Sequence, residues 1–270
     1  ANGGMKGNIG TVSHEFFHAW NVERIRPQSL EPFDFTEANM SGALWFAEGF
    51  TSYYTNLILC RAGIISEEEY INGLNGSFNY VWTSPALQYF NPVEMSYQAP
   101  FVDAATSLDP VNRENTFISY YSYGSVLGLA LDLSLRDNDL SLDDFMKLVW
   151  KTYGKTEKPY KVEDLENLLK QYAGAAFGEN FFNNYIYNSK MPDYEPLFAK
   201  MGVHISRKTN QAFLDISVED SKKGLMMTNN PKIGTSAYKA GLDKGAYIIS
   251  INDTPVKSVE EFDTITSALK

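Results

Sequence analysis

Two histidines and a glutamate near the start of the chain have the types and the spacing of a metal-binding motif. His14, Glu15 and His18 form the pattern H-E-x-x-H within an apolar stretch of helical periodicity. Because residues four positions apart lie on the same face of a helix, both imidazoles can reach one ion. Glu15 is then placed to take a proton from a water molecule at that ion. The pattern predicts metal-assisted hydrolysis, and its alternative interpretation is a pair of buried core histidines.

The third ligand to such an ion must be a carboxylate. The chain has only three histidines, and the last one, His204, lies far from the motif in the sequence. A catalytic zinc site takes three protein ligands and keeps a further position open for water. Glu48 is a lone acid in the apolar helical run 44–54, where a dication would offset the cost of burying its charge. We therefore predict one Zn²⁺ per chain, held by His14, His18 and Glu48, and the alternative for Glu48 is a capped or salt-bridged acid.

The segments around these residues resemble a known family. Residues 14–27 (HEFFHAWNVERIRP) and 45–54 (WFAEGFTSYY) are similar to the glycyl aminopeptidase family of metallopeptidases, which belongs with the thermolysin-like gluzincins. The resemblance implies an aminopeptidase that removes small N-terminal residues such as Gly or Ala, located in the bacterial periplasm or cell envelope. It also implies roles for four residues: zinc ligation by His14, His18 and Glu48, and general-base catalysis by Glu15.

A tyrosine-rich block, residues 120–124 (YYSYG), adds to this resemblance. Related aminopeptidases carry a Tyr-x-Lys-Gly element whose phenol donates a hydrogen bond to the oxyanion of the tetrahedral intermediate. Tyr121 is the matching position. Tyr123 stands where the lysine would be, so Tyr120 and Tyr123 stay open as carriers of the role, and a packing role is the alternative for all three.

Other features depart from the family pattern. Glu23 stands where the family usually has a lysine, a change that we interpret as affecting a salt bridge rather than the chemistry. The family normally has a β-rich region before the zinc helix, and only a few residues precede His14. We therefore expect the chain to be a fragment, and we expect the acid that binds the substrate α-amine to lie in the missing upstream region.

The composition narrows the possible functions. The chain has 270 residues, of which 44% are apolar and 21% charged, as expected for a globular protein of one or two domains. A net charge of −10 without a Lys/Arg-rich run argues against nucleic-acid binding. The single cysteine, Cys60, excludes an intramolecular disulfide and a cysteine-based zinc site. No apolar run reaches the length of a transmembrane segment.

Helical periodicity dominates the first two thirds of the chain. Ser66 precedes three glutamates and Ser141 lies three positions before Asp144, and both patterns are helix start signals. Residues 85–114 contain four prolines and are expected to form a long loop. We predict helices at 9–22, 41–62, 66–80, 115–137, 141–153, 162–173 and 177–188.

The pattern changes after about residue 196. An amphipathic helix is predicted from about Ser258, and short β-type runs precede it at 203–206, 212–218, 224–228 and 247–251. Residues 198–270 resemble a bacterial PDZ domain. Its carboxylate-binding loop would lie at residues 223–226, where backbone amides capture a peptide C-terminus.

The resemblance therefore implies peptide binding by Gly224, Leu225 and Met226. The chain stops within the predicted helix, so we expect this domain to lack its final strand. A packing module that binds nothing is the alternative, because fold does not imply function.

Together these features predict a mainly α catalytic domain, residues 1–197, followed by a small α+β PDZ-like domain, residues 198–270. The predicted function is a zinc-dependent aminopeptidase that acts on a peptide or protein substrate. Two alternatives stay open: a zinc endopeptidase, and a non-catalytic PDZ-type peptide-binding protein with a vestigial metal site.

Overall fold

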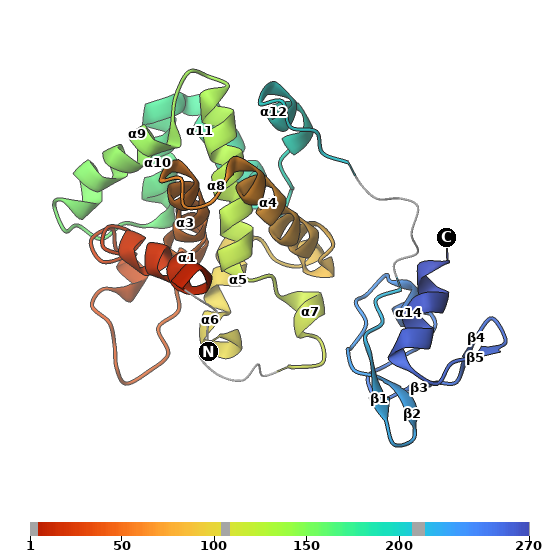
Figure 1. Ribbon diagram of the computed structural model, residues 1–270. Coiled ribbons are helices and arrows are strands. Elements are labelled where there is room, and N and C mark those ends of the chain that lie inside the picture. The colour runs from red at the N-terminus through yellow and green to blue at the C-terminus, as the bar shows by residue number, and fades with distance from the viewer. Residues whose placement is uncertain (1–4, 104–108, 207–213, 270) are drawn as a thin grey trace. The chain divides into compact units, whose positions relative to one another are not determined.

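The computed structural model describes residues 5–103, 109–206 and 214–269. They form two compact units, one from residues 1–110 and 116–204 and the other from residues 111–115 and 205–270. Helices build the first unit, whereas the second contains a small antiparallel sheet (Figure 1). The prediction of a mainly helical chain with a small sheet region is confirmed. None of the described helices combines the length and the apolar character that crossing a bilayer requires.

The first unit consists of helices joined by turns and short loops. The α-helices are α1 (Met5–Phe17), α2 (Leu44–Ala47), α3 (Gly49–Arg61), α4 (Glu67–Trp82), α5 (Pro92–Tyr97), α6 (Ala99–Val102), α8 (Tyr120–Arg136), α9 (Leu142–Val149), α10 (Val162–Ala173), α11 (Ala175–Phe181) and α12 (Tyr194–Lys200). The 3₁₀ segments are η1 (Gln28–Leu30) and η2 (Pro85–Gln88), and the π-helical segments are η3 (Trp150–Gly154) and η4 (Phe182–Ile186). Helix α7 (Arg113–Thr116) contains residues of both units.

Helix α8 forms the centre of the first unit. Most of its side chains are buried, and it packs against α2, α3, α4 and α9. Two glycines allow the backbones to approach closely, because a Cβ atom on Gly124 would lie 1.9 Å from the carbonyl oxygen of Trp45 and one on Gly49 would lie 2.4 Å from the Cα atom of Gly124. Glu48 directly precedes Gly49, and Tyr121 lies one helical turn before Gly124. The close packing therefore brings the chain segments of Glu48 and Tyr121 together.

The predicted helix start signals are confirmed. The Ser66 hydroxyl accepts a hydrogen bond from the Glu69 amide at 3.0 Å, and the Glu69 carboxylate accepts one from the Ser66 amide at 2.9 Å. The Ser141 hydroxyl accepts from the Asp144 amide at 3.1 Å. Each serine thus satisfies an amide that has no partner within its own helix.

The long loop predicted at 85–114 is wrong. The described part of this segment contains η2, α5, α6 and the first half of α7. Pro85, Pro92 and Pro100 each lie in the first turn of one of these helices, where the missing N–H removes no helical hydrogen bond. Asn91 caps α5 by accepting a hydrogen bond from the Glu94 amide at 2.9 Å. The prolines therefore begin short helices in a segment that was expected to lack them.

Of the predicted helices, one ends and another is interrupted at a candidate ligand. The helix predicted at 9–22 ends at Phe17, and His18 begins a series of turns. The helix predicted at 41–62 is divided at Glu48 into α2 and α3, although the Glu48 amide still donates to the Leu44 carbonyl at 2.8 Å. Both candidate ligands thus lie where the helical geometry is locally irregular.

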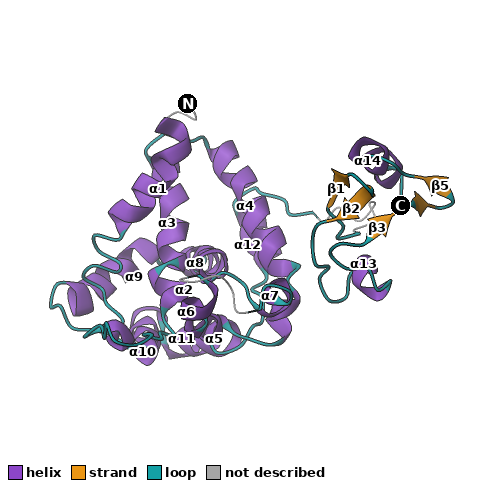
Figure 2. Ribbon diagram, turned by 90° about the horizontal axis from the view of Figure 1, so that it is seen from below, coloured by secondary structure: helices purple, strands orange, loops and turns teal. Residues whose placement is uncertain are grey.

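In the second unit, β2 (Gly224–Met227) lies between β1 (Val218–Ser221) and β3 (Tyr247–Ile248), and both pairings are antiparallel. The strands β4 (Ser250–Ile251) and β5 (Thr254–Pro255) form a separate pair. Figure 2 shows these strands in orange, together with α13 (Ser236–Lys239) and α14 (Val259–Ser267). The small core of this unit contains Leu225, Val256 and Phe262.

The strand predictions are only partly confirmed. Residues 203–206 have no regular structure, so the strand predicted there is wrong. In the run 212–218, residues 212 and 213 lie outside the described residues, and the strand begins only at Val218. The run 247–251 is divided into β3 and β4 at Ile249. Helix α14 begins as predicted, with the Ser258 hydroxyl accepting from the Glu261 amide at 3.2 Å.

Candidate metal centre

The three predicted metal ligands converge in the first unit. The Nε2 atoms of His14 and His18 each lie 3.2 Å from the Oε2 atom of Glu48. One donor atom from each of the three residues lies within 4.8 Å of the donor atoms of the other two. Ligands held about 2.1 Å from a tetrahedral zinc ion are separated by roughly 3.4 Å, which is close to these spacings. Two imidazole nitrogens and a carboxylate oxygen are also a donor set that zinc commonly takes.

Hydrogen bonds on the far side of each imidazole orient both histidines. The Nδ1 atom of His14 lies 3.3 Å from the Thr55 hydroxyl, which itself donates to the Thr51 carbonyl at 2.8 Å and so accepts from the ring. The Nδ1 atom of His18 lies 2.7 Å from the Asn21 carbonyl oxygen. A protonated Nδ1 in each neutral ring leaves the Nε2 lone pair facing Glu48, as metal ligation requires.

The charges of the site favour a cation. Burial opposes ionisation of Glu48, but hydrogen bonds with His14 and His18 outweigh it and lower the pKa of Glu48 to about 2. The hydrogen bond with Glu48 raises the pKa of His18, although burial acts in the opposite direction. Glu48 therefore carries a negative charge at neutral pH, and its carboxylate is ready to ligate a cation that replaces the imidazole protons.

The ligands lie in the wall of an open cavity of about 700 Å³. Glu15 lies in the same wall, and its catalytic role stays a prediction. Glu23, to which no role was assigned from the sequence, also lines the cavity. The complete lining comes from α1 and the turns after it, from Glu48 and α3, and from α8: Gly10, Thr11, His14, Glu15, His18, Val22, Glu23, Glu48, Ser52, Thr55, Asn56 and Tyr121.

Of the three candidate tyrosines, only Tyr121 lines this cavity. Its ring centroid lies 5.9 Å from that of His14, and the side chain is 37% exposed. Burial, and after it the charge of Glu48, raises the pKa of Tyr121 above its ordinary value of 10.0, so the hydroxyl stays protonated also at alkaline pH and can donate a hydrogen bond. Tyr120 and Tyr123 are buried, and the Tyr123 hydroxyl has no hydrogen-bond partner among the described residues. The catalytic role of Tyr121 stays a prediction.

Three residues next to the ligands were not identified from the sequence. Asn21, Thr51 and Thr55 are buried and hydrogen-bonded around the histidines and Glu48. A signal for the threonines does exist, because Thr51 and Thr55 lie three and seven positions after Glu48, on the same helical face. No comparable signal marks Asn21, because its contacts depend on how the turn after α1 packs.

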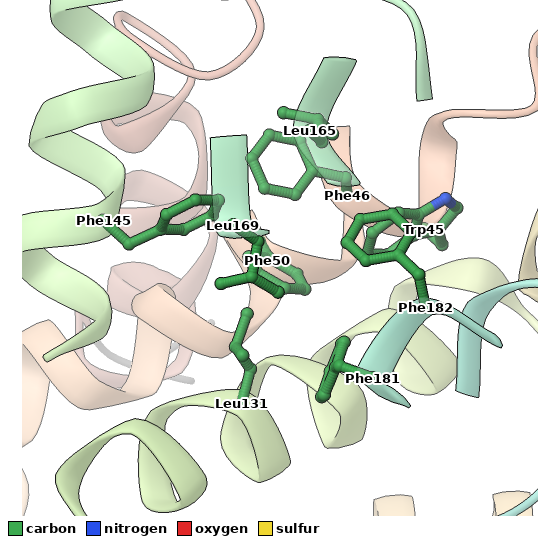
Figure 3. A pocket seen from close by; sticks show the side chains of 9 residues that line it. All are labelled: Trp45, Phe46, Phe50, Leu131, Phe145, Leu165, Leu169, Phe181 and Phe182. Carbon is green, nitrogen blue, oxygen red and sulfur yellow. The ribbon is translucent and has the colours of Figure 1, made fainter. Parts of the chain in front are cut away.

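Another cavity of the first unit lies in the apolar core and offers no functional site. Its volume is only about 10 Å³, too small for a substrate. Figure 3 shows that aromatic and leucine side chains surround it: Trp45, Phe46, Phe50, Leu131, Phe145, Leu165, Leu169, Phe181 and Phe182. It is a packing gap between α2, α3 and the helices that cover them.

The residues predicted to bind a peptide lie in a strand of the second unit. Gly224, Leu225 and Met226 belong to β2, where Leu225 and Met226 are paired with both β1 and β3. The side chain of Leu225 is fully buried in the small core. Their placement in a central strand differs from the loop that was expected, and their peptide-binding role stays a prediction.

Comparisons with known proteins support a peptidase. Residues 7–127 match the family of M61 glycyl aminopeptidases, and this range contains all the predicted ligands and catalytic residues. The chain is also similar to the crystal structure of an aminopeptidase N family protein from Idiomarina loihiensis, with 26% sequence identity and a TM-score of 0.84. That similarity covers 99% of this chain and 48% of the other, so the chain spans about half the length of this relative. No curated protein matches the chain. The two similarities support a peptidase, and the M61 glycyl aminopeptidase match spans the candidate metal centre.

Proposed function

We propose that the protein is a zinc-dependent peptidase whose active site is the cavity around His14, His18 and Glu48. The observation that carries the proposal is that three donor atoms, from segments 34 positions apart, lie within 4.8 Å of one another. The same cavity is lined by a carboxylate and a phenol that are not among the three ligands, Glu15 and Tyr121. Hydrolysis of an amide needs a base and an oxyanion donor beside the metal, and this wall supplies both.

Each side chain has a distinct part in this chemistry. A zinc ion held by His14, His18 and Glu48 would act as a Lewis acid that lowers the pKa of a water molecule. Glu15 takes the proton of the attacking water and returns it to the leaving amine. The Tyr121 hydroxyl, whose raised pKa keeps it protonated beside Glu48, donates a hydrogen bond to the oxyanion.

The substrate that we propose is a peptide with a free N-terminus and a small first residue, Gly or Ala. The similarity of residues 7–127 to glycyl aminopeptidases supports this choice. The solved relative bears the name of the aminopeptidase N family, which points to the same type of cleavage. The proposed site belongs to the class of thermolysin-like gluzincins, in which two histidines and a glutamate hold the zinc.

For the second unit, we propose a PDZ-like module that binds a peptide C-terminus. The small antiparallel sheet and the helix α14 beside β1 are compatible with such a module. Binding of a fluorescent peptide with a free C-terminal carboxylate is expected, and amidation of that carboxylate is expected to abolish it. Equal binding of both peptides would contradict recognition of the carboxylate.

Hydrolysis of aminoacyl substrates tests the catalytic proposal. Glycyl- and alanyl-p-nitroanilide are expected to be cleaved, with activity lost in a chelator and restored by zinc. N-acetylation of the same substrates is expected to abolish cleavage. Activity that persists in the chelator would contradict a zinc enzyme. Cleavage of internal bonds in N-acetylated peptides, at the same rate as in peptides with a free N-terminus, would instead identify an endopeptidase.

A further inference from the structure

Side chains, rather than backbone pairing, join the two segments that carry the candidate ligands. His14 and His18 come from α1 and the turn that follows it, whereas Glu48 lies at the junction of α2 and α3. Among the described residues, no backbone-to-backbone hydrogen bond links residues 14–25 with 44–55. The placement of the histidines relative to Glu48 therefore depends on the side chains between these segments.

The amide of Asn21 makes several of these links. Its Nδ2 atom lies 3.1 Å from the Phe46 carbonyl, 3.3 Å from the Ala47 carbonyl and 3.3 Å from the Thr51 hydroxyl. Phe46 and Ala47 end helix α2, where carbonyl groups lack partners within their own helix. Asn21 is fully buried, so water cannot easily replace the amide at these carbonyls. The amide thus holds the two residues that directly precede Glu48.

The backbone of Asn21 holds the other segment. Its carbonyl oxygen accepts the hydrogen bond from Nδ1 of His18 at 2.7 Å. The Thr51 hydroxyl lies 3.1 Å from this oxygen and 2.6 Å from the Ala47 carbonyl, with one proton to donate between them. One residue therefore contacts the ring of one ligand and the chain beside another.

We propose that Asn21 is a positioning residue that fixes His18 and Glu48 relative to each other and thereby raises the metal affinity of the site. It acts through these two ligands and does not touch the ion. The inference rests on the proposed metal site. Groups that orient metal ligands typically contribute 10–100-fold in affinity, so loss of the Asn21 amide is expected to weaken zinc binding by about that factor.

The experiment compares Asn21→Ala with a matched control, Ser96→Ala. Ser96 is also fully buried, and its hydroxyl accepts from the Trp45 amide at 3.0 Å and donates to the Pro92 carbonyl at 2.8 Å. The control thus removes a buried hydrogen bond at the opposite end of α2 from Glu48. For each protein, zinc affinity is measured by competition with a chelator, the absorption spectrum is recorded with Co²⁺ in place of zinc, and the metal-free protein is unfolded in urea.

Asn21→Ala is expected to lower zinc affinity about 10–100-fold and to change the Co²⁺ spectrum, because the ligands lose their mutual orientation. Ser96→Ala is expected to lower stability in urea while leaving the Co²⁺ spectrum as in the wild type. If metal-free Asn21→Ala does not fold, Thr51→Val decides, because it removes one partner of the amide and keeps the shape of the side chain. Thr51→Val is then expected to lower zinc affinity and to change the Co²⁺ spectrum in the same direction.

The two proposals fail in different ways. Wild-type zinc affinity and an unchanged Co²⁺ spectrum in a folded Asn21→Ala would overturn the positioning role. The same result in Thr51→Val would overturn it where Asn21→Ala does not fold. A wild-type chain that binds no zinc would overturn the metal site itself.

Discussion

The Nε2 atom of His14 lies 3.2 Å from the Oε2 atom of Glu48, which is 34 positions further along the chain. This contact links the end of α1 to the break between α2 and α3, and it lies in the wall of the cavity that holds Glu15 and Tyr121. A carboxylate that two imidazoles approach in a half-buried site is held there either by protons or by a metal ion.

Replacing Glu15 is expected to separate catalysis from metal binding. Glu15→Gln keeps the size of the side chain but removes the base, so kcat is expected to fall at least about 100-fold. Zinc content is expected to stay at the wild-type level, because Glu15 is not among the three converging ligands. Steady-state kinetics and elemental analysis of the same preparation check both results. A variant with unchanged kcat would show that another group takes the proton.

Removing the Tyr121 hydroxyl is expected to affect the transition state more than substrate binding. Tyr121→Phe is expected to lower kcat about 100- to 1,000-fold with little change in KM, because the oxyanion would lose a donor. Tyr120→Phe is the control, since this neighbouring ring is buried and does not line the cavity. We expect kcat to fall only in Tyr121→Phe, and equal kcat values in the two variants would contradict a catalytic role of the Tyr121 hydroxyl.

The stability of the metal-free protein is expected to depend on pH because of the contact between His18 and Glu48. Glu48 has a pKa of about 2, below its ordinary value of 4.5, so its contribution to stability is present above pH 4.5 and is lost as the pH falls toward 2. The raised pKa of His18 acts in the opposite direction, giving a contribution that is present below pH 6.5 and is lost as the pH rises through the raised value.

The stability difference between wild type and Glu48→Gln is therefore expected to be larger at about pH 5.5 than at about pH 9. Urea unfolding of both metal-free proteins at the two pH values measures it. The same stability difference at both pH values would show that the contact does not couple folding to the protonation of His18. Zinc affinity is expected to rise over the same range, because zinc competes with protons for the imidazoles.

Because α8 approaches α2 and α3 closely, any side chain at position 124 is expected to destabilise the protein. A Cβ atom there would lie 1.9 Å from the Trp45 carbonyl oxygen, a backbone atom that cannot rotate away. Gly124→Ala is expected to destabilise the protein by about 2–3 kcal/mol and to weaken zinc binding, because α2 must shift and Glu48 follows it.

Gly73→Ala in α4 is the matched control for this substitution. Nothing lies within 4 Å of its added Cβ, so the change is expected to stabilise the protein by up to about 1 kcal/mol. Urea unfolding and zinc competition measure both variants. Equal stability of the two variants would contradict the close approach of the helices.

Local patterns predicted the parts of the molecule that depend on local physics. The capping serines at positions 66 and 141 begin helices because their hydroxyls accept from amides three positions later. The spacing of His14 and His18 brought two imidazoles to one face, and the isolated acid Glu48 could be identified because a lone charge in an apolar run needs a partner.

Features that depend on tertiary packing could not be predicted in the same way. The prolines between residues 85 and 114 indicated a loop, yet three of them lie in the first turns of short helices, two of which have buried side chains. The break at Glu48 and the contacts of Asn21 arise where α1 meets α2 and α3, and no periodic pattern in the sequence predicts either of them. The strand predicted at 203–206 failed because β-type residues form a strand only where a partner pairs with them.

The decisive measurement is the zinc content of the purified wild type, His18→Ala and Glu48→Ala after equilibration with zinc and removal of the excess. We expect about one zinc ion per wild-type chain and little or none in either variant, with all three proteins folded by circular dichroism. A folded wild type without zinc, or variants that retain the wild-type zinc content, would contradict the assignment of His14, His18 and Glu48 as a metal centre.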